Sequence, residues 1–165
     1  MKFTQSLLKT AVGNLLLTFS DEGLHTIHFN AKVDDVIFEK SDNNKYAEQL
    51  EEYFAGTRKS FDLPLILVGT PFQKNVWEYL QQIPYGKTQS YQQVAEGIGH
   101  PHSSRAVGNA LHVNPIPLII PCHRVIRSDG GLGGFGGGIE IKRKLLDFEK
   151  RTHDTTKKNK ADHSR

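Results

Sequence analysis

Two hydrophobic patterns along the chain predict an α/β N-terminal domain followed by a mainly helical C-terminal domain. Two stretches, within the first thirty residues and over residues 61–67, alternate apolar and polar positions with a period of two. A helical stretch lies between them, which is typical of a small α/β unit. From residue 70 onward, apolar positions recur at helical spacing in short stretches that end at Pro or Gly. The 165 residues suffice for a compact domain with a small one attached. We therefore expect domains at residues 1–69 and 70–150 and a tail at residues 151–165.

The N-terminal domain is expected to open on a β-hairpin. Leu15 and Leu17 share one face of a strand, and Ile27 and Phe29 repeat the same alternation further along the chain. The intervening residues 20–23 have the composition of a turn.

A helix and a further strand are expected to complete this domain. Apolar residues recur every four positions within residues 43–55, and Gly56 follows as a C-terminal stop. Alternating apolar positions in residues 61–67 then predict a strand. His25 and His28 could ligate a metal, but this domain has no cysteine partners. We interpret them as solvent-facing strand residues and expect no metal site.

Three short helices are predicted for the C-terminal domain. The first two open on capping boxes, in which a Ser or Thr and a Gln three positions later satisfy backbone N–H groups: Thr70 with Gln73, and Ser90 with Gln93. The third opens at Ser103 or Ser104 and ends before Pro115, because the residue preceding a proline is pushed out of the helical region.

The second and third helices, joined by a short turn, match the spacing of a helix-turn-helix. Any pair of antiparallel helices shares this spacing, so the pattern alone is weak evidence. The third helix carries Arg105 near its start and Gly108 in its interior, where glycine costs about 1 kcal/mol relative to alanine. A bare backbone there allows either the close approach of a nucleic-acid chain or tight packing against another helix.

Charge is distributed unevenly along the chain, whose net charge is +3. Residues 1–69 hold seven basic and ten acidic side chains, whereas residues 70–150 hold nine and six, and residues 151–165 hold five and two. This excess of basic residues indicates a polyanionic partner or, equally, a solvated surface. The tail has no hydrophobic residue except Ala161, so we expect it to be disordered and basic.

The composition also indicates where in the cell the protein is found. No apolar run reaches membrane-spanning length and the first residues lack a signal-peptide cleavage pattern, so we expect no membrane association. A single cysteine cannot form an internal disulfide, which fits a reducing compartment. We therefore expect a cytoplasmic protein, or a nuclear one in a cell with a nucleus.

The single cysteine, Cys122, lies between Pro121 and His123 in the stretch IIPCHRV. Most lone cysteines are buried core residues. Here the neighbouring prolines indicate a rigid mount, and the adjacent cations are expected to lower the pKa of the thiol. We expect proton transfer from the thiol to His123 to pass through a water molecule, with a carboxylate distant in sequence orienting the histidine.

A glycine-rich stretch follows the cysteine, with seven glycines among residues 130–138. Gly131, Gly133 and Gly136 match GxGxxG, but the βαβ context of a dinucleotide site is absent. We interpret the stretch as a pocket wall whose backbone N–H groups lie close to a flat ligand.

Five motifs in order, SYQQVA, SRAVGNAL, NPIPLIIPCHRV, GGFGGG and KRKLLDFE, resemble the O6-alkylguanine-DNA alkyltransferases, also called methylated-DNA–protein-cysteine methyltransferases. The resemblance covers residues 70–150 densely and residues 1–69 only in outline. It implies a winged helix-turn-helix-like DNA-binding unit in the C-terminal domain. It also implies DNA repair by stoichiometric, irreversible transfer of an alkyl (methyl) group from O6-alkylguanine, and from O4-alkylthymine, to Cys122 after base flipping, with one turnover per molecule.

The resemblance assigns roles to five residues at the reacting centre. Cys122 is similar to the alkyl acceptor, His123 to the water-mediated base, and Glu149 to the carboxylate that orients the histidine. Asn114 matches the asparagine that holds the turn around the site. Tyr91 matches the tyrosine that crowds the target phosphate and donates a proton to the leaving guanine.

The same resemblance implies how the DNA and the base are held. Arg105 matches an arginine finger that enters the minor groove and fills the gap left by the flipped nucleotide. The other residues expected against DNA are Ser103, Ser104 and Gly108, and those expected around the base are Leu111, Phe135, Gly136 and Lys142. The chain has Phe135 where a tyrosine is common and Gly136 where some members have a serine, which affects substrate preference rather than the reaction.

The implied partner is double-stranded DNA containing O6-alkylguanine, bound through the minor groove with little sequence specificity by a monomer that needs no cofactor and no metal. Two alternatives remain at this point. A non-catalytic helix-turn-helix regulator would bind DNA without covalent change, and a Cys-His hydrolase would use the same nucleophile but turn over repeatedly.

Overall fold

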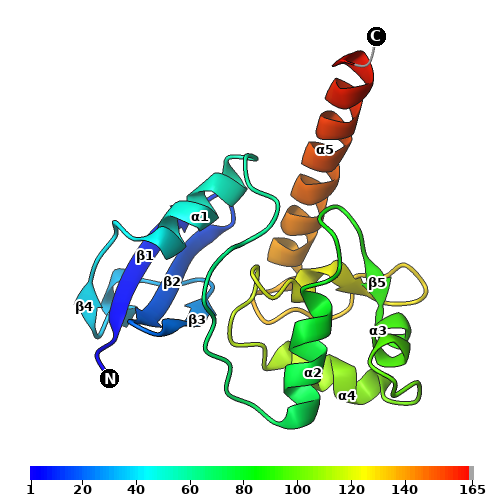
Figure 1. Cartoon of the computed structure of the whole chain (residues 1–165), viewed down its shortest axis with the longest axis horizontal. Coiled ribbons are helices and arrows are strands. Elements are labelled where there is room, and N and C mark those ends of the chain that lie inside the picture. The colour runs from blue at the N-terminus through cyan, green and yellow to red at the C-terminus, as the bar shows by residue number, and fades with distance from the viewer. Residues whose placement is uncertain (164–165) are drawn as a thin grey trace.

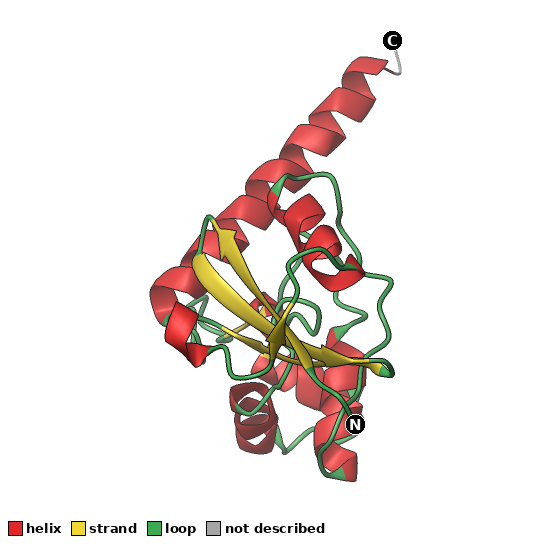
Figure 2. Ribbon diagram, turned by 90° about the vertical axis from the view of Figure 1, so that its left-hand side faces the viewer, coloured by secondary structure: helices red, strands yellow, loops and turns green. Residues whose placement is uncertain are grey.

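The computed structural model describes residues 1–163, and the side chains of residues 1–154. A sheet with one covering helix forms the N-terminal side of the molecule, and an extended connection crosses to a cluster of helices (Figure 1). The long last helix points away from both (Figure 2). The arrangement confirms the predicted fold class, an α/β domain followed by a mainly helical one. No helix in the described part of the chain is long and apolar enough to cross a bilayer.

The N-terminal sheet has the strand order β3-β2-β1-β4. Its strands are β1 (Thr4–Thr10), β2 (Gly13–Ser20), β3 (Gly23–His28) and β4 (Glu39–Lys40). The predicted hairpin is β2 with β3, which pair antiparallel. Strand β1 pairs antiparallel with β2, although its sequence did not predict a strand.

The pattern of β1 was obscured by buried polar residues. Gln5 is buried, its amide donates to Thr18 Oγ1 at 3.0 Å, and its carbonyl accepts the backbone N–H groups of Ile37 and Phe38. These bonds attach the loop that contains the 3-10 helix Val33–Asp35 to the sheet. A buried glutamine of this kind is recognisable only when its partners are known.

Helix α1 (Lys45–Phe54) packs against the sheet and confirms the helix predicted there. Asn44 caps it by accepting the N–H of Ala47, and Gly56 follows with a φ of +82°. The strand predicted for residues 61–67 is wrong. Leu65 forms only an isolated bridge to Leu24, because Pro64 has no N–H with which to continue a ladder.

The C-terminal domain contains α2 (Pro71–Leu80), β5 (Gln89–Ser90), α3 (Tyr91–Gly97), α4 (Ser104–His112), the 3-10 helix Cys122–Arg124 and β6 (Val125–Ile126). Both predicted capping boxes are confirmed, at Thr70 and at Ser90. Ser103 occupies the N-cap position of α4 but its side chain makes no capping bond. Strands β5 and β6 pair in parallel beside α3.

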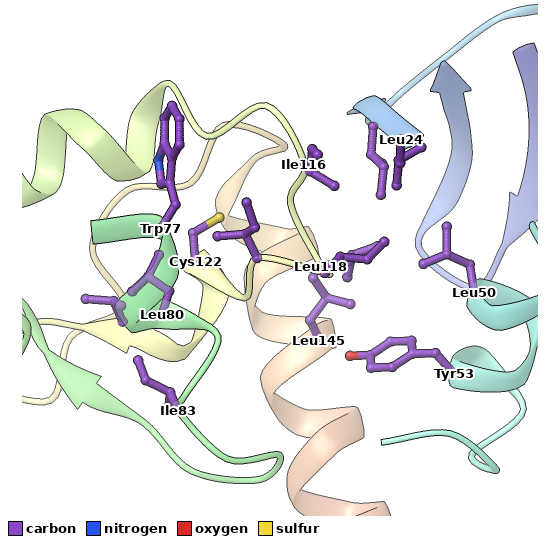
Figure 3. Packing of buried hydrophobic residues seen from close by; sticks show 14 of the residues in the cluster. Leu24, Leu50, Tyr53, Trp77, Leu80, Ile83, Ile116, Leu118, Cys122 and Leu145 are labelled. Atoms are coloured by element: carbon purple, nitrogen blue, oxygen red, sulfur yellow. The ribbon is translucent and has the colours of Figure 1, made fainter. Parts of the chain in front are cut away.

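One hydrophobic core runs through both domains. Leu24 and Leu50 from the N-terminal domain face Ile116, Leu118 and Leu145 from the C-terminal domain (Figure 3). A backbone bond from the Ile27 N–H to the Pro115 carbonyl, 3.0 Å long, crosses the same boundary. The two domains therefore pack as one body rather than as units joined only by a linker.

Helix α5 (Ile139–His163) ends the described chain. It includes residues 151–163, so the expectation of a disordered tail is wrong for this stretch. The start of the tail is anchored because Thr152 donates to the Phe148 carbonyl at 2.8 Å and forms a hydrogen bond with the Tyr85 hydroxyl. Residues 164 and 165 lie outside the described residues.

Candidate active site

Cys122 lies between two cavities. The first, of about 360 Å³, opens toward α3 and α4 and is lined by Tyr91, Ser104, Arg105, Gly108, Leu111, His112, Cys122, Gly134, Phe135 and Gly136. The second, of about 390 Å³, opens toward the N-terminal domain, and its lining includes Phe29, Asn30 and Pro117. Both cavities share Leu111, His112, Cys122, Phe135 and Gly136. The thiol can therefore be approached from the helix-turn-helix side and from the domain boundary.

The segment that leads to the cysteine is held in an unusual conformation by Asn114. Its Oδ1 accepts the Ile116 N–H at 3.0 Å, and its Nδ2 donates to the Ile120 carbonyl at 2.9 Å. Between them Leu118 has a φ of +77°, a region that a leucine rarely adopts. Such strain persists only where surrounding contacts impose it and is typical of functional sites. Asn114 thus holds the turn, as the resemblance implied.

Burial of the Cys122 side chain favours the thiol over the thiolate. Burial raises its pKa to about 11, against the opposing effects of a hydrogen bond with Asn114 and the charge of Lys142. The expectation of a lowered pKa is therefore wrong, because desolvation outweighs the lowering effect of the Lys142 charge. The thiol needs a proton acceptor before it can attack.

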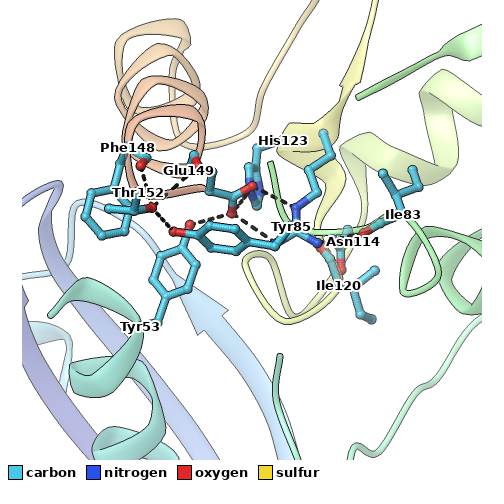
Figure 4. A network of polar contacts seen from close by, with 10 residues as sticks. Tyr53, Ile83, Tyr85, Asn114, Ile120, His123, Phe148, Glu149 and Thr152 are labelled. Atoms are coloured by element: carbon cyan, nitrogen blue, oxygen red, sulfur yellow. Dashed lines mark hydrogen bonds and ion pairs between the residues drawn. The ribbon is translucent and has the colours of Figure 1, made fainter. Parts of the chain in front are cut away.

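His123 can be that acceptor. Its Nε2 lies 2.7 Å from Glu149 Oε2, and both side chains are buried (Figure 4). Glu149 is ionised and can only accept, so Nε2 carries the hydrogen and Nδ1 keeps its lone pair. Nδ1 is buried and has no hydrogen-bond partner among the described residues. A water molecule between Nδ1 and Sγ would complete the predicted path for the thiol proton.

Glu149 lies on α5 and binds Arg124 as well as His123. Arg124 donates from Nε to Oε1 at 2.8 Å and from Nη2 to Oε2 at 3.0 Å, and its Nη1 donates to the Ile83 carbonyl. Although burial alone would raise the pKa of Glu149, its partners His123 and Arg124 hold it well below its usual range. Burial lowers the pKa of His123, which keeps the imidazole neutral.

Two members of this network were not predicted as site residues. Arg124 lies inside the PCHRV motif, but it was interpreted only as a nearby positive charge, because the sequence does not show which carboxylate it meets. Tyr53 donates from its hydroxyl to Glu149 Oε2 at 2.6 Å. In the sequence it is one aromatic residue on the apolar face of α1, a pattern that indicates only core packing.

Lys142 was expected to line the substrate pocket, and this expectation is wrong. The side chain is fully buried behind the glycine loop, where Nζ donates to the Val125 carbonyl at 2.7 Å and the Gly134 carbonyl at 3.2 Å. Burial lowers its pKa to about 8. Lys142 therefore fixes the loop rather than touching a ligand in either cavity.

Tyr91 begins α3 and forms a wall of the first cavity. Burial raises the pKa of its hydroxyl, while a hydrogen bond with the Gly134 backbone opposes this rise. The loop passes so close that a Cβ on Gly133 would lie 2.5 Å from the Tyr91 hydroxyl oxygen, and Gly133 has a φ of +74°. Only glycine satisfies both conditions at this position.

The residues expected to meet DNA gather on α4. Arg105 is exposed at the mouth of the first cavity and has no hydrogen bond or ion pair with any described residue. Ser104 donates to Gln92 Oε1 at 2.8 Å, and Ser103 lies outside the cavity lining. A Cβ on Gly108 would meet only the Tyr91 ring, at 3.9 Å, so this glycine is not explained by packing against another helix.

The glycine loop supplies Phe135 and Gly136 to both cavities. The Phe135 ring packs on Phe29 of the N-terminal domain with centroids 5.4 Å apart. Asn30 donates to the Gly137 carbonyl at 3.3 Å. A Cβ on Gly136 would meet nothing within 4 Å, so its backbone is open to the cavities. Among the described residues, no group of three or more His, Cys, Asp or Glu could hold a metal ion.

Comparisons with known proteins match both domains. Residues 71–151 match the DNA binding domain of 6-O-methylguanine DNA methyltransferase, and residues 4–67 match its ribonuclease-like domain. A methylated-DNA–protein-cysteine methyltransferase of Methanosarcina acetivorans is 44% identical over 150 residues, which cover 87% of this chain and 96% of the relative. The chain belongs to the methylated-DNA–protein-cysteine methyltransferase family. The constitutive enzyme of Bacillus subtilis is 50% identical over 104 residues, 62% of this chain and 63% of that one.

Solved structures of the family share the fold. The Mycobacterium tuberculosis OGT in complex with DNA superimposes with a TM-score of 0.83 at 40% identity, covering 90% of this chain and 94% of that one. An O6-methylguanine-DNA methyltransferase from Pyrococcus kodakaraensis has a TM-score of 0.71 at 26% identity, covering 89% and 98%. The resemblance drawn from the sequence motifs is thus confirmed along both domains.

Proposed function

We propose that this methyltransferase repairs double-stranded DNA by moving the alkyl group of O6-alkylguanine, and of O4-alkylthymine, irreversibly to Cys122. One observation carries the assignment of the acceptor. The family transfers a methyl group to a protein cysteine, and this chain has a single cysteine, which lines a cavity beneath α4 beside a buried histidine–carboxylate pair. The cavity of about 360 Å³ is of a size that admits one flipped base.

Access requires that the base leave the duplex. The O6 atom of a stacked guanine cannot reach a thiol at the bottom of a cavity, so the nucleotide must flip, at a cost of a few kcal/mol. Arg105, which is exposed and lines the first cavity, would fill the vacated position from the minor groove. The absence of a side chain at Gly108, which lines the first cavity, would let the sugar-phosphate chain approach α4. Contacts to phosphates and sugars carry no sequence information.

The proton path follows from the buried relay formed by Cys122, His123 and Glu149. His123 Nδ1 takes the thiol proton through water, and Glu149 stabilises the imidazolium that forms. The thiolate attacks the alkyl carbon, so that an S–C bond forms as the C–O6 bond breaks. Tyr91 protonates the leaving guanine, and solvent returns the His123 proton to Tyr91, which balances the reaction. A thioether is stable to hydrolysis, so each molecule reacts once.

The remaining expectations belong to the same proposal. Action as a monomer is one of them. The single cysteine supports a reducing compartment, the cytoplasm or a nucleus.

Intact-mass measurement after incubation with duplex DNA containing O6-methylguanine tests the proposal. We expect one added methyl group per chain at excess DNA, and peptide mapping should locate it on Cys122. A DNA-binding regulator would bind the duplex with no change in mass. A hydrolase would consume substrate repeatedly and leave the protein unmodified, and either result would refute the proposed reaction.

A further inference from the structure

The N-terminal domain contributes one polar atom to the buried relay. Tyr53 lies on α1, is completely buried, and donates from its hydroxyl to Glu149 Oε2 at 2.6 Å (Figure 4). Glu149 is on α5, and the two residues are 96 positions apart in the chain. The bond is therefore a contact between the domain without reacting groups and the carboxylate that supports His123.

Three donors converge on the same carboxylate oxygen. Oε2 accepts from Tyr53 at 2.6 Å, from His123 Nε2 at 2.7 Å and from Arg124 Nη2 at 3.0 Å. Among the described residues, Oε1 accepts a hydrogen bond only from Arg124 Nε. Donors that share one oxygen compete for its charge. The strength with which Glu149 attracts a proton to His123 thus depends on what the other two donors withdraw.

We propose that Tyr53 is a positioning residue that sets the proton affinity of His123 by holding part of the charge of Glu149. This inference rests on the proposed role of His123 as the acceptor of the thiol proton. The histidine must be neutral before the reaction, because an imidazolium has no lone pair at Nδ1 to receive that proton. A buried carboxylate 2.7 Å away favours the imidazolium, and the Tyr53 hydroxyl reduces this effect.

Tyr53 suits this role because it does not titrate in the working range. Burial and the negative charge of Glu149 place the pKa of its hydroxyl well above the usual value, so the group remains a donor. Arg124 also withdraws charge from Glu149, but it places a positive charge beside His123. A neutral donor withdraws charge from the carboxylate without repelling the imidazolium that forms during the reaction.

The groups that face the His123–Glu149 pair come from every surrounding element. Arg124 and Cys122 belong to the same 3-10 helix as His123, and Lys142 approaches from α5. Tyr53 comes from α1, and Tyr85 from the connection after α2. Arg124 and Lys142 lower the pKa of His123, and Glu149 raises it. Tyr53 is the neutral donor among these groups that binds the carboxylate directly.

Tyr53→Phe tests the proposal, with Tyr85→Phe as the matched control. Both substitutions remove one buried phenol hydroxyl and keep the ring, but the Tyr85 hydroxyl binds Thr152 rather than Glu149. The titration of His123 is followed by NMR of its ring nitrogens in the full chain. We expect Tyr53→Phe to raise the pKa of His123 by about half a unit to one unit, and Tyr85→Phe to leave it unchanged.

The pH dependence of transfer to Cys122 gives a second readout. In Tyr53→Phe the acid limb of the rate profile is expected to move to higher pH, so that transfer is about threefold to tenfold slower on that limb and equal to wild type at higher pH. An unchanged or lowered His123 titration, or a rate loss that is uniform with pH, would overturn the proposal. The titration needs no alkylated DNA, so its outcome is independent of whether the proposed repair reaction is correct.

Discussion

The two domains of this protein differ in how they contribute to the site. The C-terminal domain holds the reacting groups, with Cys122, His123 and Tyr91 on adjacent short elements. The N-terminal domain holds none, yet it contacts the site, and two of its contacts are specific. Tyr53 binds Glu149, and Phe29 with Asn30 binds the glycine loop.

This difference teaches that the motif-bearing domain is not a complete active site. The C-terminal residues define which bonds form and break. The N-terminal contacts affect two properties that the motifs do not specify. These are the proton affinity of His123 and the conformation of the glycine loop. Such a loop has little conformational preference of its own, so its shape depends on what packs against it. Four substitutions test this division, beginning with the largest expected effect.

Cys122→Ser is expected to abolish transfer while leaving DNA binding nearly unchanged. A serine hydroxyl is far less ionised than a thiol near neutral pH, whereas α4 and Arg105 stay in place. Intact-mass measurement and a binding titration on the same duplex separate the two effects. Methyl transfer by the serine variant at a rate comparable to wild type would show that the reacting group lies elsewhere.

Glu149→Gln is expected to slow transfer strongly and to destabilise the fold by about 3–5 kcal/mol, because Arg124 would keep a buried charge without its counter-ion. Denaturant unfolding measures the loss. Folding lowers the pKa of Glu149, so the ionised side chain stabilises the fold fully above the unfolded-state pKa of about 4.3. This stabilisation is lost as the pH falls below that value. The variant should therefore lose less stability than wild type as the pH falls through this range. Parallel curves of unfolding free energy against pH for the two proteins would contradict the stabilising role of the Glu149 charge.

Arg105→Ala is expected to slow transfer from duplex DNA at least about tenfold more than transfer from free O6-benzylguanine. Only the duplex substrate carries the cost of unstacking that Arg105 offsets. Single-turnover rates at saturating substrate make the comparison. Equal losses on both substrates would mean that Arg105 supports the pocket rather than the flipped state, and a loss confined to affinity would indicate a phosphate contact.

Phe29→Ala is expected to slow transfer about threefold on both duplex and free base, because loss of the ring pair with Phe135 loosens the wall common to both substrates. Phe19→Ala is the control. Phe19 is partly buried in the same domain and packs on Tyr46, away from the loop. Equal rate losses in the two variants would mean that the effect of Phe29→Ala comes from general destabilisation of the N-terminal domain and not from the loop contact.

Local chemistry made several features predictable from the sequence. The helix starts at Thr70 and Ser90 were predictable because a capping box satisfies backbone groups within four residues. The spacing of motifs around Cys122 indicated the family for the same reason, since each motif is a short segment with its own turn or cap. Gly133 is readable as a loop glycine, although the Tyr91 hydroxyl that excludes any other residue there is 42 positions away in the chain.

The tertiary structure decided the rest. The sequence contains Arg124, Glu149 and Tyr53, but which donor meets which carboxylate depends on the packing of α1 and α5 around the Cys122 segment. Burial depends on the same packing, which is why the pKa of Cys122 is raised despite its cationic neighbours and why Lys142 lies behind the loop. Capping and spacing act over a few residues of the chain. Desolvation and charge pairing act through space, and they take their values only when distant segments meet.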